Sequence, residues 1–252
     1  MTAQPIIKFL TGAGAGSRRQ MTAAIKAGRV GVNGQIVESF IQPVDGETDK
    51  VTIDGRRIAS QTQRMIYLLL NKPKGIVSTT SDDRGSKTVI DILPLKYREA
   101  RLYPVGRLDK ESTGLILLTN DGDFTYHLTH PKFEREKEYL VQIEGNLTAE
   151  EKAELEKGPE LEDGKTSPAR VRAVKSPPFN YSITIHEGKN RQVRRMFASL
   201  GYRVRELKRI RIDTIAIGGI LPGETRELTP GELKSLKRSK SIQLMPTRRV
   251  HT

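Results

Sequence analysis

Apolar positions in the first sixty residues change from helical to strand spacing. The apolar side chains of residues 6–10 recur at the intervals of a short helix. After a glycine-rich turn, Ser17 and Gln20 have the spacing of a capping box and predict the start of a second helix, which ends at about Gly28. Residues 29–37 alternate around Asn33-Gly34 and residues 51–58 around Asp54-Gly55, which predicts two short antiparallel strand pairs.

The longer remainder of the chain mixes strand and helix patterns without a regular repeat. Strands are predicted at 65–70, 114–119, 138–143, 181–186 and 209–217, and helices at 122–129, 148–157 and 191–200. This irregular order favours an α+β fold with a mixed, largely antiparallel sheet flanked by helices over a series of βαβ units. We therefore predict a small domain at 1–60, a polar linker at 61–64, a larger domain at 65–238 and a flexible basic tail at 239–252.

Composition excludes several classes of protein. The 252 residues carry 43 Lys or Arg against 30 Asp or Glu, a formal net charge of +13, and no cysteine. Disulfide scaffolds, thiolate nucleophiles, iron–sulfur clusters and cysteine-containing zinc sites are thereby excluded. The longest apolar run, residues 66–70, is far too short to span a bilayer, so a soluble cytoplasmic protein, expected to be monomeric, is the prediction.

The positive charge is clustered, which favours a surface that meets phosphates over general tuning of solubility. Nine basic residues and one acid lie between 189 and 211, and six basic residues and no acid lie from 234 onward. Residues 150–163, in contrast, carry seven acids and two lysines. We expect a basic side that binds nucleic acid and an acidic helix that faces away from it.

The densest group of polar side chains precedes the buried strand 114–119. Arg107, Asp109, Ser112 and Thr113 stand on the loop that enters it, at a sheet edge where sites are commonly built. On this pattern alone, a carboxylate that only caps the loop is the favoured role for Asp109, and a functional role is the alternative. In the strand 137–143, Tyr139 shares a face with the apolar positions 141 and 143, which fits either a core residue or a cleft residue.

The helix 191–200 has a buried stripe formed by residues 193, 196, 197 and 200. On a helical wheel Arg194 lies at the border of this stripe, where it would be partly buried and could hold a carboxylate through both arms of its guanidinium. Arg191 and Arg195 fall on the opposite face, towards solvent or phosphate.

The N-terminal pattern resembles the small RNA-binding fold named after ribosomal protein S4. The resemblance covers about residues 6–54 and rests on the small-residue turn, Ser17-Arg-Arg19 and the segment Ala27-Gly-Arg-Val-Gly-Val-Asn-Gly34. It implies a module that docks on structured RNA through basic residues, here Lys8, Arg18, Arg19, Lys26 and Arg29.

The larger domain resembles the pseudouridine synthases, in the ribosomal subgroup that carries an S4-like domain. Four ordered motifs carry the resemblance: Asn71–Gly75, Gly106–Leu115, Lys137–Tyr139 and Glu187–Phe197. It implies that Asp109 is the catalytic carboxylate, Tyr139 the ring that packs on the target base and Arg194 the partner of Asp109. We further expect Arg107, Lys137, Arg191 and Arg195 to contact RNA.

The resemblance implies isomerisation of a uridine in ribosomal RNA, with large-subunit 23S RNA favoured over small-subunit 16S RNA. The carboxylate could add to the sugar, add to the base or remove a sugar proton. No cofactor or metal is required, because there is no redox change and no net hydrolysis. His127 and His130 lack an evident third ligand. The alternatives are a non-catalytic RNA-binding or ribosome-assembly protein and an RNA methyltransferase, although the larger domain has no glycine-rich loop after a first strand.

Overall fold

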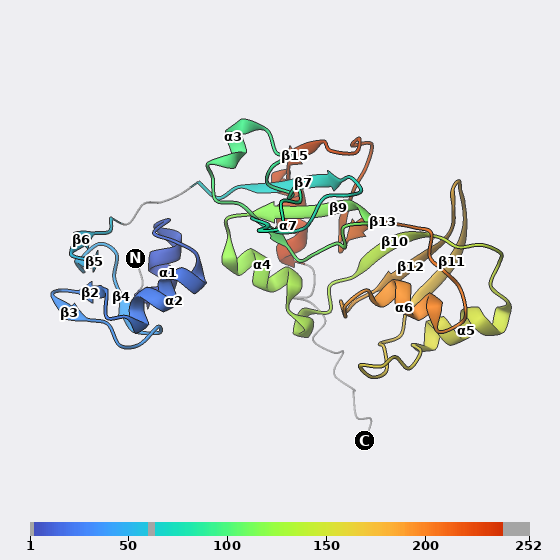
Figure 1. Ribbon diagram of the computed structural model, residues 1–252, viewed down its shortest axis with the longest axis horizontal. Coiled ribbons are helices and arrows are strands. Elements are labelled where there is room, and N and C mark those ends of the chain that lie inside the picture. Colours follow the sequence, from blue (N-terminus) through green and yellow to red (C-terminus); the bar gives the residue numbers. More distant parts are fainter. Residues whose placement is uncertain (1–2, 60–63, 239–252) are drawn as a thin grey trace, which may run out of the picture. The chain divides into compact units, whose positions relative to one another are not determined.

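The computed structural model describes residues 3–59 and 64–238. The chain forms two compact units, Met1–Met65 and Ile66–Thr252, and each is described by itself (Figure 1). The predicted linker lies almost wholly, and the predicted tail entirely, outside the described residues.

The N-terminal unit packs two helices against short strands. Its core holds Ile6, Phe9 and Leu10 of the first helix, Met21 and Ile25 of the second, and valines of the strands. The elements in chain order are β1 (Gln4–Pro5), α1 (Ile6–Gly12), α2 (Arg18–Lys26), β2 (Val30–Val32), β3 (Gln35–Ile36), β4 (Pro43–Val44), β5 (Val51–Ile53) and β6 (Arg56–Arg57).

Local sequence signals place these elements. Ser17 and Gln20 form the predicted capping box, in which each side chain accepts a hydrogen bond from the backbone N–H of the other residue. Asn33 and Asp54 both adopt positive φ and are each followed by a glycine, which closes the hairpins β2–β3 and β5–β6. The order β3-β2-β5-β6 gives a four-stranded sheet.

The larger unit is built on a nine-stranded mixed sheet. Its path is β11-β12-β10-β13-β9-β7-β15, with β8 paired to β9 and β14 paired to β13. All pairs are antiparallel except β9 with β13. The elements are β7 (Tyr67–Lys72), α3 (Leu95–Arg98), β8 (Tyr103–Val105), β9 (Thr113–Thr119), α4 (Gly122–Thr129), the 3-10 helix η1 (Pro131–Phe133), β10 (Lys137–Gln142), α5 (Ala149–Lys157), β11 (Arg170–Ser176), β12 (Phe179–Ile185), α6 (Gln192–Ala198), β13 (Glu206–Ile212), β14 (Ile215–Ala216), β15 (Thr225–Glu227) and α7 (Pro230–Arg238).

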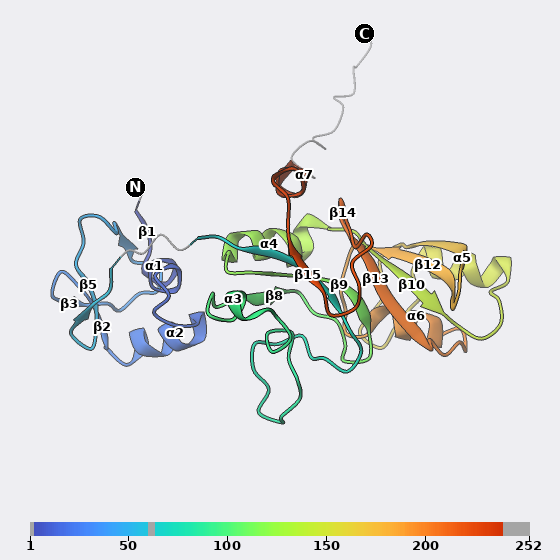
Figure 2. The same ribbon diagram turned by 90° about the horizontal axis from the view of Figure 1, so that it is seen from above.

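Apolar side chains on the two faces of this sheet belong to separate cores. One core joins Tyr139 and Val141 of β10 to Met196 and Phe197 of α6 and to Leu155 of α5. The second core lies over β7 and β9 and includes side chains from α4 and α7: Leu69, Leu115, Leu117, Phe124, Leu128 and Leu236. Figure 2 shows α6 and α7 on opposite sides of the strands. Among the described residues, no helix is long and apolar enough to cross a membrane.

The parallel pair β9–β13 brings two distant segments into close contact. Arg209 of β13 is the register partner of Gly114 of β9. Gly114 has a φ of +98°, and a Cβ atom there would come within 2.2 Å of the Arg209 carbonyl oxygen. Only glycine fits this position without backbone displacement. The entry to β9, which carries the Asp109 loop, is thereby fixed against β13.

The structure departs from the sequence prediction at several elements. The single strand predicted at 209–217 is a hairpin, β13–β14, that turns at Asp213, whose φ is +50°. Isoleucines on both sides of the turn continue the strand pattern and conceal it. The elements α3, β8, β11 and β15 were not predicted, because they are short or, in β11, mostly charged and exposed.

Candidate active site

The loop that carries Asp109 is hydrogen-bonded to the segment that follows β7. The Ser78 hydroxyl donates to the Leu108 carbonyl at 2.8 Å and accepts from the Leu108 N–H at 3.1 Å. The Gly75 N–H donates to the Lys110 carbonyl at 2.8 Å. Hydrogen bonds on both sides of Asp109 therefore fix its backbone, while its side chain stays 30% exposed.

Lys72 is a second constraint on this loop, and it was not among the site residues predicted from the sequence. Its side chain is fully buried, and its ammonium donates to the carbonyls of Pro73 at 3.0 Å, Ile76 at 2.7 Å and Lys110 at 3.3 Å. Burial lowers its pKa to about 8, partly opposed by the charges of Glu111 and Asp109. The sequence feature that could have indicated a role for Lys72 is its position at the end of an apolar strand, directly before a proline.

Two arginines approach the carboxylate of Asp109. Nη1 of Arg191 lies 3.6 Å and Nε of Arg194 lies 3.9 Å from the same oxygen, Oδ2. Arg194 donates from Nη1 to the Val204 carbonyl at 2.9 Å. Its Nε and Nη2 are buried and have no hydrogen-bond partner among the described residues, so the predicted bidentate pair with Asp109 does not form. Burial, together with nearby Arg191, lowers the pKa of Arg194, and Asp109 opposes this.

Arg191 was predicted to lie on the helix face opposite the buried stripe, towards solvent or phosphate; its side chain is half exposed, but it also lies beside Asp109. Helix α6 begins at Gln192, and Arg191 is its N-cap with a φ of +47°. A residue in the left-handed conformation does not follow the helical wheel. Arg191 therefore points towards Asp109, although half of its side chain remains exposed.

Tyr139 lies in the core and contacts a buried arginine. Its side chain is 8% exposed, and its hydroxyl accepts from Nη1 of Arg209 at 3.5 Å. Arg209 is 2% exposed, and its Nε donates to the Leu115 carbonyl of β9 at 2.7 Å. Arg209, which the sequence analysis did not select, thus connects the Tyr139 strand to the strand that follows the Asp109 loop.

The remaining residues predicted to contact RNA in this unit have different environments. Arg107 is exposed, two positions before Asp109. Lys137 is half-buried and donates to the carbonyls of Arg135 and Glu187, and burial lowers its pKa to about 8. Lys137 is therefore bound within the protein and not directed to a surface.

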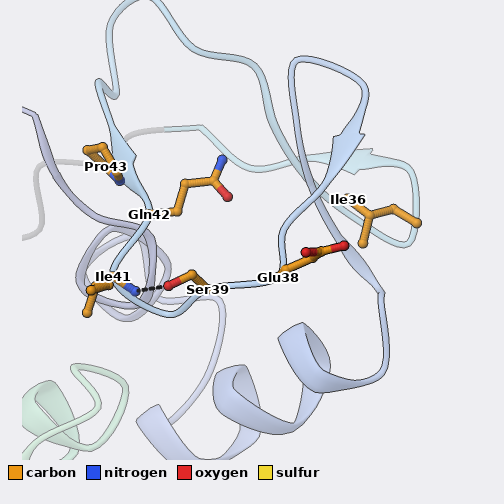
Figure 3. Close-up of a pocket in the computed structure, with 6 residues that line it drawn as sticks. All are labelled: Ile36, Glu38, Ser39, Ile41, Gln42 and Pro43. Carbon is orange, nitrogen blue, oxygen red and sulfur yellow. Dashed lines mark hydrogen bonds between the residues drawn. The ribbon is translucent and has the colours of Figure 1, made fainter.

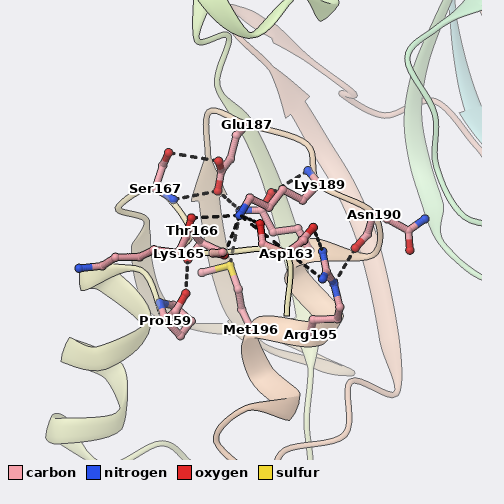
Figure 4. Close-up of polar contacts among 12 residues, drawn as sticks. Pro159, Asp163, Lys165, Thr166, Ser167, Glu187, Lys189, Asn190, Arg195 and Met196 are labelled. Atoms are coloured by element: carbon pink, nitrogen blue, oxygen red, sulfur yellow. Dashed lines mark hydrogen bonds and ion pairs between the residues drawn. The ribbon is translucent and has the colours of Figure 1, made fainter. Parts of the chain in front are cut away.

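Arg195 is engaged by the acidic segment. Its Nη1 and Nη2 donate to the two carboxylate oxygens of Asp163 at 2.8 and 2.9 Å (Figure 4). Lys189 donates to the carbonyls of Asp163, Gly164 and Lys165. Asp163 lies beyond α5, so the end of the acidic segment contacts the basic one, while the expectation that the acidic helix faces away from nucleic acid stays a prediction.

The N-terminal unit presents its predicted basic residues at the surface. Lys8, Arg18, Arg19, Lys26 and Arg29 are all exposed. Arg29 pairs with Asp54, whereas Arg18, Arg19 and Lys26 have no ion-pair partner among the described residues. A hollow in the same unit is lined by exposed apolar and polar side chains of the segment 36–43 (Figure 3).

No group of three or more His, Asp or Glu side chains in the described part of the chain could hold a metal ion. His127 instead donates from Nδ1 to the Asp123 carbonyl, and His130 accepts the Lys132 N–H. The site therefore offers a carboxylate, two guanidinium groups, a tyrosine ring and a buried ammonium group.

Comparison with known proteins gives one consistent answer. Residues 66–199 match the family model described as RNA pseudouridylate synthase. The chain is 41% identical over 234 residues to the ribosomal large subunit pseudouridine synthase B of Bacillus subtilis (strain 168), covering 91% of this chain and 94% of that one. It is 38% identical to an uncharacterized RNA pseudouridine synthase of Aquifex aeolicus (strain VF5), with 97% and 98% covered.

A solved structure described as a pseudouridylate synthase is similar to the present one with a TM-score of 0.66 and 33% identity, and the match covers 92% of this chain and 99% of that chain. The family predicted from the sequence motifs is thereby confirmed, as is the α+β architecture with a mixed, mostly antiparallel sheet. On both sequence and fold, the chain belongs to the RNA pseudouridine synthase family.

Proposed function

We propose that this enzyme converts a specific uridine of large-subunit ribosomal RNA to pseudouridine. The main support is Asp109, a partly exposed carboxylate on a fixed loop, with guanidinium nitrogens of Arg191 and Arg194 at 3.6 and 3.9 Å from its Oδ2. All three residues lie inside the segment that matches the family. The choice of large-subunit RNA is supported by the Bacillus subtilis relative, which is named a ribosomal large subunit pseudouridine synthase.

In this proposal Asp109 is the catalytic carboxylate. The N1–C1′ bond of the uridine breaks, the uracil turns, and a C5–C1′ bond forms; the proton on C5 is lost and N1 gains one, so the atoms balance. Asp109 must be ionised to add to the nucleotide or to accept a proton. Arg191 and Arg194 lie 3.6 and 3.9 Å from Oδ2 of Asp109, so their positive charges attract the carboxylate group and help to hold it in place.

Tyr139 is proposed to pack against the extruded base. Extrusion from the stack costs a few kcal/mol, which contacts in the pocket must offset. Tyr139 is 8% exposed in this structure, so a base reaches its ring only after the surrounding side chains move. Arg209 holds the hydroxyl end of the ring and limits the directions in which it can move.

The N-terminal unit is proposed to act as an S4-like RNA-binding module formed by residues 1–60. Support comes from its two helices and hairpins and from the exposed Arg18, Arg19 and Lys26, which have no ion-pair partner within residues 3–59 and 64–238. Lys8, Arg29 and Arg107 complete the set that we expect to meet phosphates. Such contacts position the RNA but carry no sequence information by themselves.

The test is pseudouridine mapping on unmodified 23S and 16S transcripts incubated with the protein. We expect one modified site in the 23S transcript and none with the Asp109→Asn variant, which keeps the size of the side chain but removes its charge. Asp83→Asn is the matched control, because Asp83 is exposed and has no polar partner in the described part of the chain.

Modification of the 16S transcript alone would refute the assignment to the large subunit. A normal pseudouridine level with Asp109→Asn would refute the catalytic role of Asp109.

A further inference from the structure

Four rings gather on the surface at the junction of α4 and η1. The chain has only 7 Tyr, 6 Phe, no Trp and 4 His, yet Tyr126, His127, His130 and Phe133 fall within eight residues. Tyr126 is 45% exposed, both histidines are exposed and Phe133 is partly exposed. We call these four residues and Lys132 the ring platform.

The rings contact one another edge to face or at a tilt. The centroid of Tyr126 lies 4.7 Å from that of His130 and 5.7 Å from that of Phe133, and the His127 and Phe133 centroids are 4.8 Å apart. Nζ of Lys132 lies 4.9 Å from the Tyr126 centroid and 4.8 Å from the Phe133 centroid. The cation and the rings are therefore held together at the surface.

The backbone fixes this arrangement. His130 caps η1 by accepting the Lys132 N–H at its Nδ1, and His127 donates from Nδ1 to the Asp123 carbonyl. The buried Arg135 donates to the His127 carbonyl at 3.2 Å and pairs with Asp213. A surface fixed in this way loses little conformational entropy when a ligand binds.

Burial does not explain the platform. Phe124 and Leu128, at 6% and 4% exposure, form the buried face of α4 and pack into the core. Tyr126 and His127 are therefore not needed to fill the core. Neighbouring exposed rings that leave aromatic surface in water are typical of a binding surface. Aromatic side chains with a nearby cation suit a nucleic-acid base above all, since every base has a flat face that can stack.

The platform also lies next to the elements of the proposed active site. A Cβ atom at Gly106, three residues before Asp109, would come within 3.6 Å of the Thr129 side chain at the end of α4. Three residues span at most about 10 Å. On its other side, Phe133 is followed after three residues by β10, the strand of Tyr139.

We propose that the ring platform binds an unpaired base of the RNA substrate, outside the target uridine, by stacking on the rings, while Lys132 neutralises a phosphate. This inference rests on the proposed function, since it takes the substrate to be RNA. The ring platform would then be a second subsite, which binds the RNA strand beside the extruded nucleotide.

The absence of tryptophan provides a direct test. In the Asp109→Asn background, Tyr126→Trp introduces the only indole of the chain, at the platform. A base that stacks on it will quench its fluorescence as the 23S transcript is added. Tyr202→Trp in the same background is the control, because Tyr202 lies beside the acidic helix α5 and bonds to Glu151. We expect saturable quenching for the first variant and no change for the second.

Binding and turnover give the second readout. In the active protein, Tyr126→Ala should weaken binding of the transcript by roughly 5- to 100-fold and raise KM, with kcat unchanged at saturating RNA. Tyr126→Phe keeps the ring and should match the wild type. Unchanged thermal midpoints show that both variants are folded.

Each outcome separates the two proposals. Unquenched fluorescence with Tyr126→Trp, or unchanged affinity with Tyr126→Ala, overturns the platform while pseudouridine formation by the wild type upholds the function. Loss of kcat without a change in binding also overturns it. Failure of the wild type both to bind the transcript and to modify it defeats the proposed function itself.

Discussion

Two basic regions of this molecule differ in whether their positive charges are paired with carboxylates. In segment 189–211, six of nine basic residues form ion pairs with carboxylates of the same unit: Lys189, Arg191, Arg194, Arg195, Arg205 and Arg211. Arg209 is buried against a carbonyl and Tyr139. In the N-terminal unit, Arg18, Arg19 and Lys26 are exposed and have no such partner among the described residues.

The comparison shows that a run of basic residues is not yet a surface for phosphate. Segment 189–211 was expected to belong to a basic side that binds nucleic acid, but most of its cations form ion pairs with nearby carboxylates. The smaller excess in the N-terminal unit is directed to solvent. Counter-ion release on RNA binding depends on cations that are free to exchange partners, so the N-terminal unit should contribute more per charge.

The largest expected effect comes from Arg194. Replacing it with alanine leaves Asp109 with only the exposed Arg191, so kcat should fall on the order of 10²–10³-fold. Stability should fall by about 1–3 kcal/mol, because the Val204 carbonyl loses its donor and Asp109 is only 30% exposed. Single-turnover rates and denaturant unfolding measure the two effects.

Arg194→Lys is the matched control for this position. It keeps the charge and should retain part of both the rate and the stability. Wild-type values for Arg194→Ala would show that Arg194 belongs with the exposed surface cations and would contradict its placement at Asp109.

The next effect tests the other side of the comparison. The double variant Arg18→Ala, Arg19→Ala should raise KM for RNA and reduce the slope of log affinity against log salt by up to about 2. Both residues lie in the first turn of α2, where a cation is disfavoured by the helix dipole, so stability should not fall. Binding titrations at several salt concentrations give the slope.

The double variant Arg195→Ala, Arg205→Ala removes two charges from the paired region. Because these arginines already neutralise Asp163 and Glu144, the salt slope should stay close to that of the wild type. Equal reductions in slope for the two double variants would erase the distinction between the regions.

The buried Lys72 should make the stability of the protein depend on pH, unlike the exposed cations of the N-terminal unit. With a pKa of about 8 in the folded protein against 10.5 ordinarily, Lys72 releases its proton earlier than the unfolded chain does. Stability should therefore rise with pH between about 8 and 10.5, and Lys72→Met should lack this rise. The difference in unfolding free energy between the two proteins should shift by about 2–3 kcal/mol in favour of the wild type across that window.

Parallel denaturant curves for wild type and Lys72→Met at pH 7.5, 9 and 10 measure this shift. A pH-independent difference would mean that Lys72 titrates as an exposed lysine does, despite its burial.

The smallest effect belongs to an exposed pair of the same segment. The side chains of Arg205 and Glu144 are 42% and 75% exposed. Arg205→Ala should cost about 0.2–1 kcal/mol, less at high salt, because water screens exposed pairs. A larger loss in thermal unfolding would indicate that this pair is part of the structural network around α6.

Local patterns predicted much of the fold and the family. The capping box at Ser17, the hairpin at Asn33-Gly34 and the helix Gly122–Thr129 depend on neighbours in the chain, and all three form as predicted. The motif around Asp109 indicated the family for the same reason. The hairpin at Asp213 was missed because its turn residues are flanked by isoleucines that continue the strand pattern.

The sequence by itself determined the family and the local elements, since these depend on residue identity and short-range spacing. Only the tertiary structure decided which charges are paired, where Arg191 points, and that Lys72 and Arg209 are buried. Such partners lie far apart in sequence, as do Arg209 and Leu115 or Arg195 and Asp163. Burial and pairing arise when the sheet brings distant segments together, so local sequence patterns do not predict them.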